Sequence, residues 1–342
     1  MLGLVAPAGR VLCTISDRRI GESSGLVAAG DSLYTVNDGG SRLRVYVLDR
    51  GCRVRRVIDN PLDPYDVEDL ARGPDGRLWL ADIGDNESSR RTVAIEVLTE
   101  AGEVTLFRLT YPDGPHDAEA LLLDRRGRPY LVTKEPLGAR VYTPARTLAA
   151  GHPTPLRQVA RLALLPTGTP GGPVGAASQV LATGGAVSPD GTRLVLRTYT
   201  DAYLWSAPDG DLAAALRSGT PHRIPLPATG QGEAVAFAAD GRSLLTSTEV
   251  LPAPVHAVPL AGADLPGAPA SPSTPSTHST PSARSSPSTP SDPAASAGRP
   301  GGTAGDSATG DGTLSLGAVT VGILLAAALV WGSTKIIRAI RR

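Results

Sequence analysis

The stretch that decides the fold is DLARGPDGRLWLADIGDN, residues Asp69–Asn86. An apolar run leads into the turn Pro74-Asp75-Gly76, and a second apolar run follows the turn and ends in polar residues. Two short apolar runs joined by a glycine-containing turn are typical of a β-hairpin. We therefore expect two adjacent antiparallel strands in this stretch.

The same hairpin pattern occurs four more times before residue 260. Each copy is followed by one or two further strand candidates, and the copies recur every ~45–65 residues. Four strands at such a period are the signature of a β-propeller blade. The chain is therefore predicted to be all-β, with a propeller at 11–262. The other four hairpins are Gly25–Asp38, Glu119–Glu135, Gly185–Asp201 and Glu233–Glu249.

Five hairpins favour five blades, and six blades is the alternative. The longest interval contains the Gly/Pro-rich segment Leu165–Gly175, which we interpret as an insertion loop rather than a hidden blade. Only one further strand candidate, Pro254–Leu260, follows the fifth hairpin, while Arg10–Asp17 at the start of the chain has no partner. We expect this N-terminal strand to complete the last blade, which leaves no open sheet edge. A β-sandwich would explain the alternation but not the repeat.

The two cysteines fit such a closure. Cys13 lies in the expected closing strand, and Cys52 lies between the outer strands of the next blade. In an exported protein they would form a disulfide across the closure, whereas in a cytosolic one two buried thiols would be the better interpretation.

The last 80 residues change in composition. Residues 263–313 are rich in Pro, Ser, Thr, Ala and Gly, which predicts a disordered stalk. No charge occurs in Leu314–Thr334, a length that spans the ~30 Å hydrocarbon core of a bilayer as a helix. We expect a transmembrane helix at 314–337 and a basic cytoplasmic tail at 338–342, because basic flanks stay inside.

This orientation places the propeller outside a cell membrane that the chain crosses once. Export needs an N-terminal signal, and residues 1–10 lack a basic region and a full apolar region. Residues 1–10 are therefore interpreted as a disordered start or the remnant of a signal peptide whose true start codon lies upstream.

Composition excludes several classes of protein. The chain has 33 Lys+Arg against 33 Asp+Glu, so it lacks the basic balance of a nucleic-acid-binding protein. Its two cysteines exclude a disulfide-dense scaffold and a zinc-ribbon array. The expected partners are the membrane and either an envelope protein or a small-molecule ligand.

Four of the five hairpins carry a glutamate at or just before the first strand. In a propeller these positions meet around the central channel, which predicts a ring of carboxylates at one mouth. Ca²⁺, which takes six to eight oxygen ligands, would suit the four glutamates. The alternatives are neutralisation by Lys134, Arg197 or His116, or hydrogen bonds to backbone N–H groups. The glutamates are Glu22, Glu68, Glu119 and Glu233, and the nearby aspartates are Asp66, Asp69 and Asp117.

A second polar set lies at the far end of the hairpins. These residues are typical turn formers, and DIGDN lacks the spacing and terminal glutamate of an EF-hand loop. GESSG, residues 21–25, matches the nucleophile elbow G-x-S-x-G, but a propeller strand is the wrong context for that motif. No catalytic residue is identified. The second set comprises Asn37, Asp38, Asp82, Asp85, Asn86, Lys134, Glu135, Asp201 and Glu249.

Several motifs together resemble a known group of proteins. They are ESSGL, NDGG, DVEDLA, ADIGDN, YPDGPHDAEALL, VTKE, SPDGTRLVLRTYTDAYLW and QGEAVAF, within about residues 11–260. The group consists of secreted or membrane-anchored actinobacterial propellers, described as WD40-like and without an established activity. The Gly-His and Trp-Asp signature of true WD40 repeats is absent. The glutamate-ringed channel is similar, more distantly, to that of gluconolactonase-type or phytase-like calcium propellers.

These observations predict an envelope-anchored extracytoplasmic propeller that binds a ligand or a protein. The alternative is a calcium-dependent hydrolase that acts on a lactone or a phosphoester at the channel mouth. Fold alone does not decide between them.

Overall fold

The computed structural model describes residues 9–136 and 138–264 of the 342-residue chain. The predicted membrane helix and basic tail lie outside the described residues, as does the stalk apart from its first two residues. Among the described residues, no helix has the length and apolar character needed to cross a membrane.

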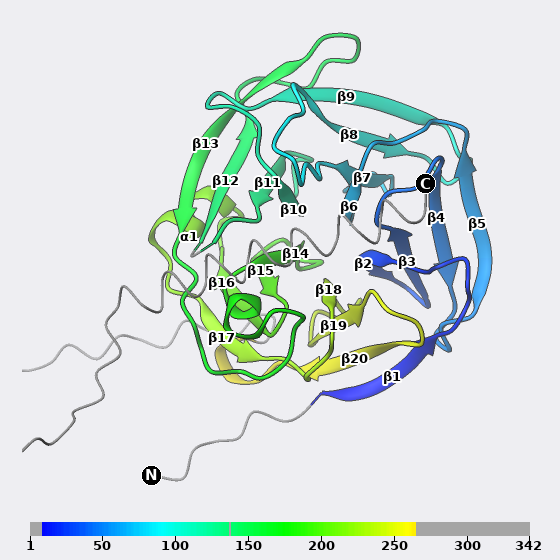
Figure 1. Ribbon diagram of the computed structural model, residues 1–342, viewed down its shortest axis with the longest axis vertical. Helices are drawn as coiled ribbons and strands as arrows, with labels where there is room; N and C mark the ends of the chain where they lie inside the picture. The colour runs from blue at the N-terminus through cyan, green and yellow to red at the C-terminus, as the bar shows by residue number, and fades with distance from the viewer. Residues whose placement is uncertain (1–8, 137, 265–342) are drawn as a thin grey trace, which may run out of the picture.

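The described chain folds into four-stranded antiparallel units in sequence order (Figure 1). The first unit consists of β2 (Ser23–Ala29), β3 (Ser32–Asn37), β4 (Leu43–Leu48) and β5 (Val54–Asn60). The second consists of β6 (Val67–Arg72), β7 (Leu78–Asp82), β8 (Val93–Leu98) and β9 (Val104–Thr110). The third consists of β10 (Ala118–Leu123), β11 (Pro129–Thr133), β12 (Ala139–Pro144) and β13 (Thr154–Leu162). The fourth consists of β14 (Ala182–Val187), β15 (Arg193–Thr198), β16 (Asp201–Ser206) and β17 (His222–Pro225). The last consists of β18 (Gly232–Phe237), β19 (Ser243–Thr248), β20 (Ala253–Pro259) and β1 (Arg10–Ile15).

The first strands of these units surround a central axis. Strand β2 contacts β6, β6 contacts β10, β10 contacts β14, β14 contacts β18, and β18 contacts β2 (Figure 1). A cycle of inner strands with sheets radiating outward is a β-propeller, so the all-β propeller expectation is confirmed. The inner strands approach closely: a Cβ at Gly25 would lie 2.3 Å from the backbone N of Leu70.

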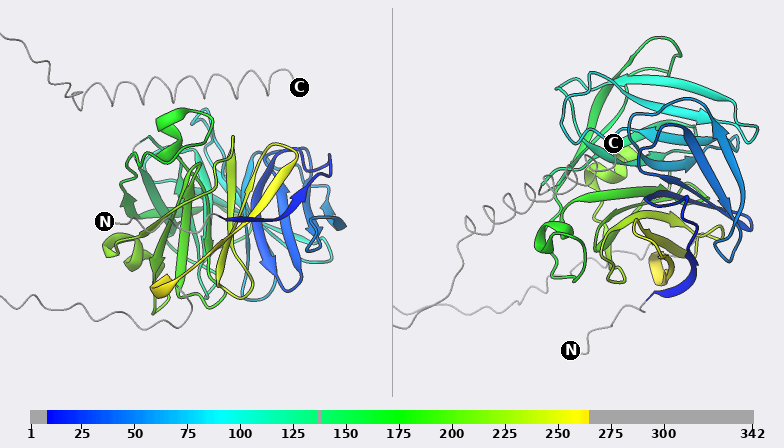
Figure 2. Two further views of the ribbon diagram at one scale, coloured as in Figure 1. Left: turned by 90° about the horizontal axis from the view of Figure 1, so that it is seen from below. Right: turned by 45° about the vertical axis from the view of Figure 1, so that its right-hand side comes forward.

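Apolar side chains fill the space between neighbouring sheets. One cluster joins β2 and β4 to β18 and β20 and includes Ile15, Leu26 and Tyr46, while another joins β6–β8 to β10–β12. Facing apolar sheets of this kind supply the main favourable free energy of folding. The sheets therefore pack face to face around the central axis (Figure 2).

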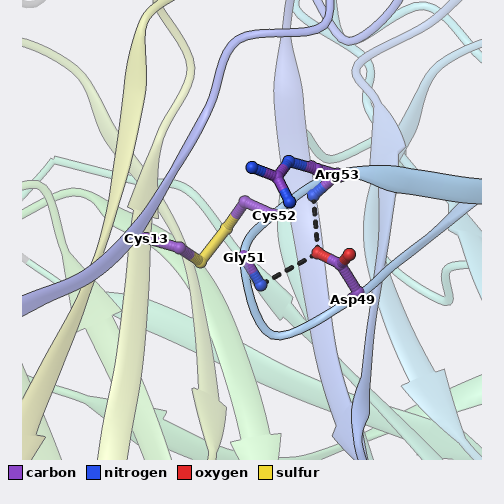
Figure 3. The surroundings of a disulfide bond; sticks show 5 residues. All are labelled: Cys13, Asp49, Gly51, Cys52 and Arg53. Carbon is purple, nitrogen blue, oxygen red and sulfur yellow. Dashed lines mark hydrogen bonds between the residues drawn. A yellow bond between two sulfur atoms is a disulfide. The ribbon is translucent and has the colours of Figure 1, made fainter.

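The ring is closed by the N-terminal strand. Strand β1 pairs antiparallel with β20, as the unpartnered sequence at Arg10–Asp17 indicated. Cys13 on β1 and Cys52 in the β4–β5 turn form a disulfide, and Asp49 supports that turn by accepting hydrogen bonds from the backbone N of Gly51 and of Arg53 (Figure 3). The bond links the last unit to the first.

Two additions modify the regular pattern. Strand β13 pairs in parallel with β9, which joins the second and third units into one eight-stranded sheet. The segment Leu165–Gly175 contains no strand and leads into the short 3₁₀ helix η1 (Gly175–Gln179), as expected of an insertion loop. Helix α1 (Leu212–Ser218) lies between β16 and β17 and contacts β13.

Candidate functional site: a carboxylate-lined channel end

The glutamates predicted to ring the channel lie where the inner strands begin. Glu68, Glu119 and Glu233 are near the start of β6, β10 and β18, and Glu22 directly precedes β2. The charge of Glu119 acts on both Glu68 and Glu233, so these strand starts face one another. We call this region the carboxylate end.

Three carboxylates form the tightest group there. The ligand oxygens of Asp38, Asp66 and Glu68 all lie within 4.8 Å of one another, and we call these residues the acidic cluster. Asp66 and Glu68 are buried, and Asp38 is half-buried. Asp38 follows β3 of the first unit, whereas Asp66 and Glu68 belong to the second, so the cluster bridges two sheets.

Gly84 makes the packing of this cluster possible. A Cβ at position 84 would lie 2.1 Å from Oε1 of Glu68 and 2.5 Å from Oδ2 of Asp66. The loop that holds Gly84 is fastened by Arg90, whose Nη1 donates to the Gly84 carbonyl at 2.7 Å and whose Nη2 pairs with Asp82 at 2.8 Å. A backbone without a side chain therefore cradles the two carboxylates.

The electrostatics of Glu68 are unfavourable for a charged group. Burial raises the pKa of Glu68 well above its usual value, and the charges of Asp38, Glu119 and Asp66 raise it further. Like charges at such separations need protons or a cation to offset them. Carboxylate oxygens are the preferred ligands of hard divalent cations, so the donor set and its glycine cradle fit Ca²⁺. Water and backbone oxygens would complete the coordination.

Glu119 has a basic partner. Nζ of Lys134 lies 2.8 Å from Oε1 of Glu119. Burial raises the pKa of Glu119 to about 7 even though Lys134 opposes the shift. Burial would lower the pKa of Lys134, but Glu119, Tyr199 and Glu233 together raise it well above its usual value. Lys134 is therefore a buried cation that offsets the charge of Glu119 and Glu233.

Glu233 and Arg197 complete that side. Burial raises the pKa of Glu233 well above its usual value, and its Oε2 is buried without a hydrogen-bond partner among the described residues. Arg197 is fully buried and donates to the backbone oxygens of Ala234 and Ser247 at 2.7 and 2.9 Å. Burial lowers the pKa of Arg197 to about 10, while Glu233 opposes the shift.

Asp69 and Asp117 have structural partners instead. Asp69 accepts hydrogen bonds from the backbone N of Leu70, Leu121 and Gly185, and so ties β6 to β10 and β14. Burial raises the pKa of Asp69 to about 8. Asp117 accepts a hydrogen bond from the backbone N of Asp85 at 2.8 Å. The bonds to backbone N–H groups considered from the sequence are thus present at both aspartates.

Three residues of the second set hold the surrounding loops. Asn37 donates to the carbonyl of Arg19, which fastens a loop at the edge of the first unit. Asp82 accepts from the backbone N of Tyr65 and of Asp66, while Asp85 accepts from the backbone N of Ser89 and of Arg90. Only Asp85 bonds the turn that directly follows it, as a turn former does, whereas Asn37 and Asp82 bond backbone groups 16 to 18 residues earlier in the chain.

His116 lies beside other partners. Its ring is 3.1 Å from Oδ1 of Asp113 and stacks on Tyr142, with Arg140 also within hydrogen-bond distance. The structure therefore gives His116 a carboxylate partner of its own rather than one from the acidic cluster.

The predicted calcium set and the observed group differ. Of Glu22, Glu68, Glu119 and Glu233, only Glu68 belongs to the acidic cluster. Lys134 pairs with Glu119, and its charge also acts on Glu233. The backbone of Glu22 borders the cluster, since its carbonyl accepts from the backbone N of Asp38 at 2.8 Å. A cation held by all four glutamates stays a prediction. Sequence reasoning had placed Asp38 among turn formers and had not singled out Gly84 or Tyr199.

The GESSG sequence does not form a nucleophile elbow. Ser23 and Ser24 are buried in β2. The Ser23 hydroxyl pairs with that of Thr35 at 2.9 Å, and the Ser24 hydroxyl donates to the carbonyl of Glu68. Both serines therefore connect strands.

No protein-family model and no curated protein matches the chain. Similar solved structures include a luciferin-regenerating enzyme that is 13% identical to this chain. The alignment covers 73% of this chain and 95% of the enzyme, with a TM-score of 0.43. A gluconolactonase from Xanthomonas campestris is 17% identical, with 75% and 82% covered and a TM-score of 0.41. The β-propeller domain of Cps50 (Swd1) from Myceliophteria thermophila is 12% identical, with 74% and 100% covered and a TM-score of 0.41. These neighbours are of the propeller type, and their low similarity carries no argument about function.

Proposed function

We propose that the chain is an envelope-anchored extracytoplasmic β-propeller of five blades that binds a ligand at the carboxylate end of its channel. The observation that carries the proposal is the acidic cluster of Asp38, Asp66 and Glu68, whose oxygens lie within 4.8 Å of one another beside the Gly84 cradle. The ligand is a divalent cation or a cationic group of a partner. Five blades are supported by the cycle of five inner strands.

The anchoring part of the proposal rests on the sequence. An uncharged stretch at Leu314–Thr334 followed by Lys335 and Arg338 supports a single span with the C-terminus inside. A disulfide between Cys13 and Cys52 suits an oxidising compartment.

Calorimetric titration of Ca²⁺ into the full chain tests the binding proposal. We expect saturable binding and a higher melting temperature, because a ligand that binds only the folded state stabilises it. Glu68→Gln removes one donor charge and should abolish both effects. The control Glu103→Gln removes an exposed charge in the β8–β9 turn, outside the cluster, and should retain both effects. Absence of both heat and stabilisation in the unaltered protein would overturn the proposal.

A second candidate function is a calcium-dependent hydrolase. The observation that favours it is Glu119, whose pKa of about 7 lies in the range of a general base, next to the acidic cluster. The phosphoester version has less support, since Lys134 pairs with Glu119 and Arg197 donates to backbone oxygens rather than offering a phosphate-binding surface. Ca²⁺-dependent turnover of an aliphatic lactone that is lost in Glu119→Gln would favour the hydrolase.

A further inference from the structure

A concave region lies near the turns that follow the inner strands, at the opposite end from the carboxylates. It is a cleft of about 770 Å³ near the β6–β7 and β10–β11 turns, the β12–β13 connection and helix α1. Glu68 and Glu119 stand at the start of β6 and β10, whereas these turns follow the ends of the same strands. The cleft is therefore separated from the carboxylate end by the length of the inner strands.

Arginine dominates the charge of this cleft. Its lining has six arginines against three aspartates. They come from five separate segments (the β6–β7 turn, the β10–β11 turn, the β12–β13 connection, β13 and α1), so the fold rather than a local run of sequence brings them together. The arginines are Arg77, Arg126, Arg128, Arg146, Arg157 and Arg217.

Most of these guanidinium groups have no acidic partner. Arg77 pairs with Asp75, and the other five form no ion pair within residues 9–136 and 138–264. Two of the lining aspartates are already engaged with backbone groups. Asp124 accepts hydrogen bonds from the backbone N of Arg126 and of Arg128, and Asp211 accepts one from the backbone N of Ala214 at the start of α1.

The lining also includes an apolar surface. Phe107 and Leu148 are half-buried and pack against the cluster that contains Trp79, and all three side chains line the cleft. The cleft thus combines apolar contact area with a cationic rim. Guanidinium groups bind phosphate and carboxylate through paired hydrogen bonds, and several in one concavity concentrate the positive potential there.

We propose that this cleft is a binding site for an organic anion that carries several phosphate or carboxylate groups. The anionic groups bind the exposed guanidinium groups of Arg126, Arg157 and Arg217, and the body of the ligand lies on Phe107 and Leu148. This site is independent of cation binding at the carboxylate end.

Titration of inorganic tripolyphosphate and of citrate into the full chain tests the proposal. Both probes carry closely spaced anionic groups, and the stronger binder distinguishes a phosphate from a carboxylate ligand. The variant Arg126→Glu/Arg217→Glu should weaken binding at least about tenfold, because it places repulsive charges in the cleft. Both side chains are exposed and without ion pairs within the described chain, so the fold should be retained.

The matched control is Arg91→Glu/Arg242→Glu. Both arginines are exposed, the change in net charge is identical, and neither lines the cleft. The control should bind tripolyphosphate as the unaltered protein does. Equal weakening in both variants would mean attraction by overall charge and would overturn the proposal, as would the absence of binding of both anions to the unaltered protein.

Discussion

The two ends of the inner strands carry acidic groups at one end and basic groups at the other, in different environments. At the carboxylate end, Glu68, Glu119 and Glu233 are buried, and burial shifts the pKa of each. In the cleft at the other end, Arg126, Arg157 and Arg217 are exposed. The formal net charge of zero for the whole chain therefore conceals an uneven distribution of acidic and basic groups between these two ends.

The difference shows how each end can bind. Buried carboxylates are costly to ionise and need a compensating charge, so the acidic cluster suits a small cation that enters a preformed site. Exposed arginines keep their hydration until a ligand arrives, so the cleft suits a larger anion and is sensitive to salt. Whether the two ends act as independent sites can be tested in four ways, given in order of decreasing expected effect.

The largest expected effect comes from the ring closure that both ends share. Cys13→Ser/Cys52→Ser opens a disulfide that spans 39 residues of sequence, and the free energy of unfolding should fall by about 3–4 kcal/mol. Denaturant unfolding measures the loss, and a reducing agent should reproduce it in the unaltered protein. If the ends are independent sites on one ring, Ca²⁺ and tripolyphosphate affinities should change little while the protein stays folded.

Gly84→Ala should affect the carboxylate end alone. The new Cβ collides with the carboxylates of Glu68 and Asp66, so we expect a loss of about 1–3 kcal/mol in stability together with loss of Ca²⁺ binding. Calorimetry and thermal unfolding measure the two effects. Gly230→Ala is the control, since a Cβ there meets nothing within 4 Å. Unchanged Ca²⁺ affinity in Gly84→Ala would show that the close packing at Gly84 is not needed for Ca²⁺ binding.

Glu96 tests how burial acts on a carboxyl near the carboxylate end, where it hydrogen-bonds to Asp82. Burial raises the pKa of Glu96 well above its usual value, and the neighbouring Asp82 raises it further. The folded protein therefore retains a proton that the unfolded chain loses above about pH 4.5, so the free energy of unfolding should fall as pH rises above that value.

Glu96→Gln replaces this carboxyl with a neutral group of the same shape. At neutral pH the variant should be more stable than the unaltered protein by about 1–2 kcal/mol, and the two should converge near pH 4. Thermal unfolding between pH 4 and pH 8 measures the difference. Parallel pH profiles for the two proteins would contradict the expected proton retention at Glu96.

Salt should produce the smallest and most selective effect. Raising the salt concentration from about 50 to about 200 mM should weaken tripolyphosphate binding several-fold, because exposed arginines attract anions through screened charges. Ca²⁺ binding at the buried cluster should weaken less. Titrations at both salt concentrations provide the comparison. If salt weakened the binding of both ligands equally, the expected difference between an exposed and a buried site would be contradicted.

Much of the fold was predictable because each element is local. A glycine turn between two apolar runs predicts a hairpin, and its recurrence predicts a propeller. The pairing of β1 with β20 followed from counting, since Arg10–Asp17 had no partner and the last unit lacked a strand. The parallel pairing of β13 with β9 was not predictable, because it depends on how two neighbouring sheets meet at their outer edges.

The candidate site was predictable only in part. The sequence placed Glu68, Glu119 and Glu233 at one end of the channel and named Lys134 as a neutralising partner. It could not show which group pairs with which glutamate. Asp38 approaches Glu68 from another sheet, and Lys134 pairs with Glu119 across a hairpin. The sequence named Asp69 only as an aspartate near the ring, and it could not show that this side chain accepts backbone N–H groups from β6, β10 and β14.

By itself the sequence determined the repeat, the closing strand, the two cysteines and the residue types at the start of each inner strand, because these depend on neighbours along the chain. Only the tertiary structure decided which carboxylates meet, which ones bind lysine or backbone groups, and that six arginines from five segments share one cleft. Such sites form between sheets, where the distance between side chains is set by packing around the ring and not by separation in sequence.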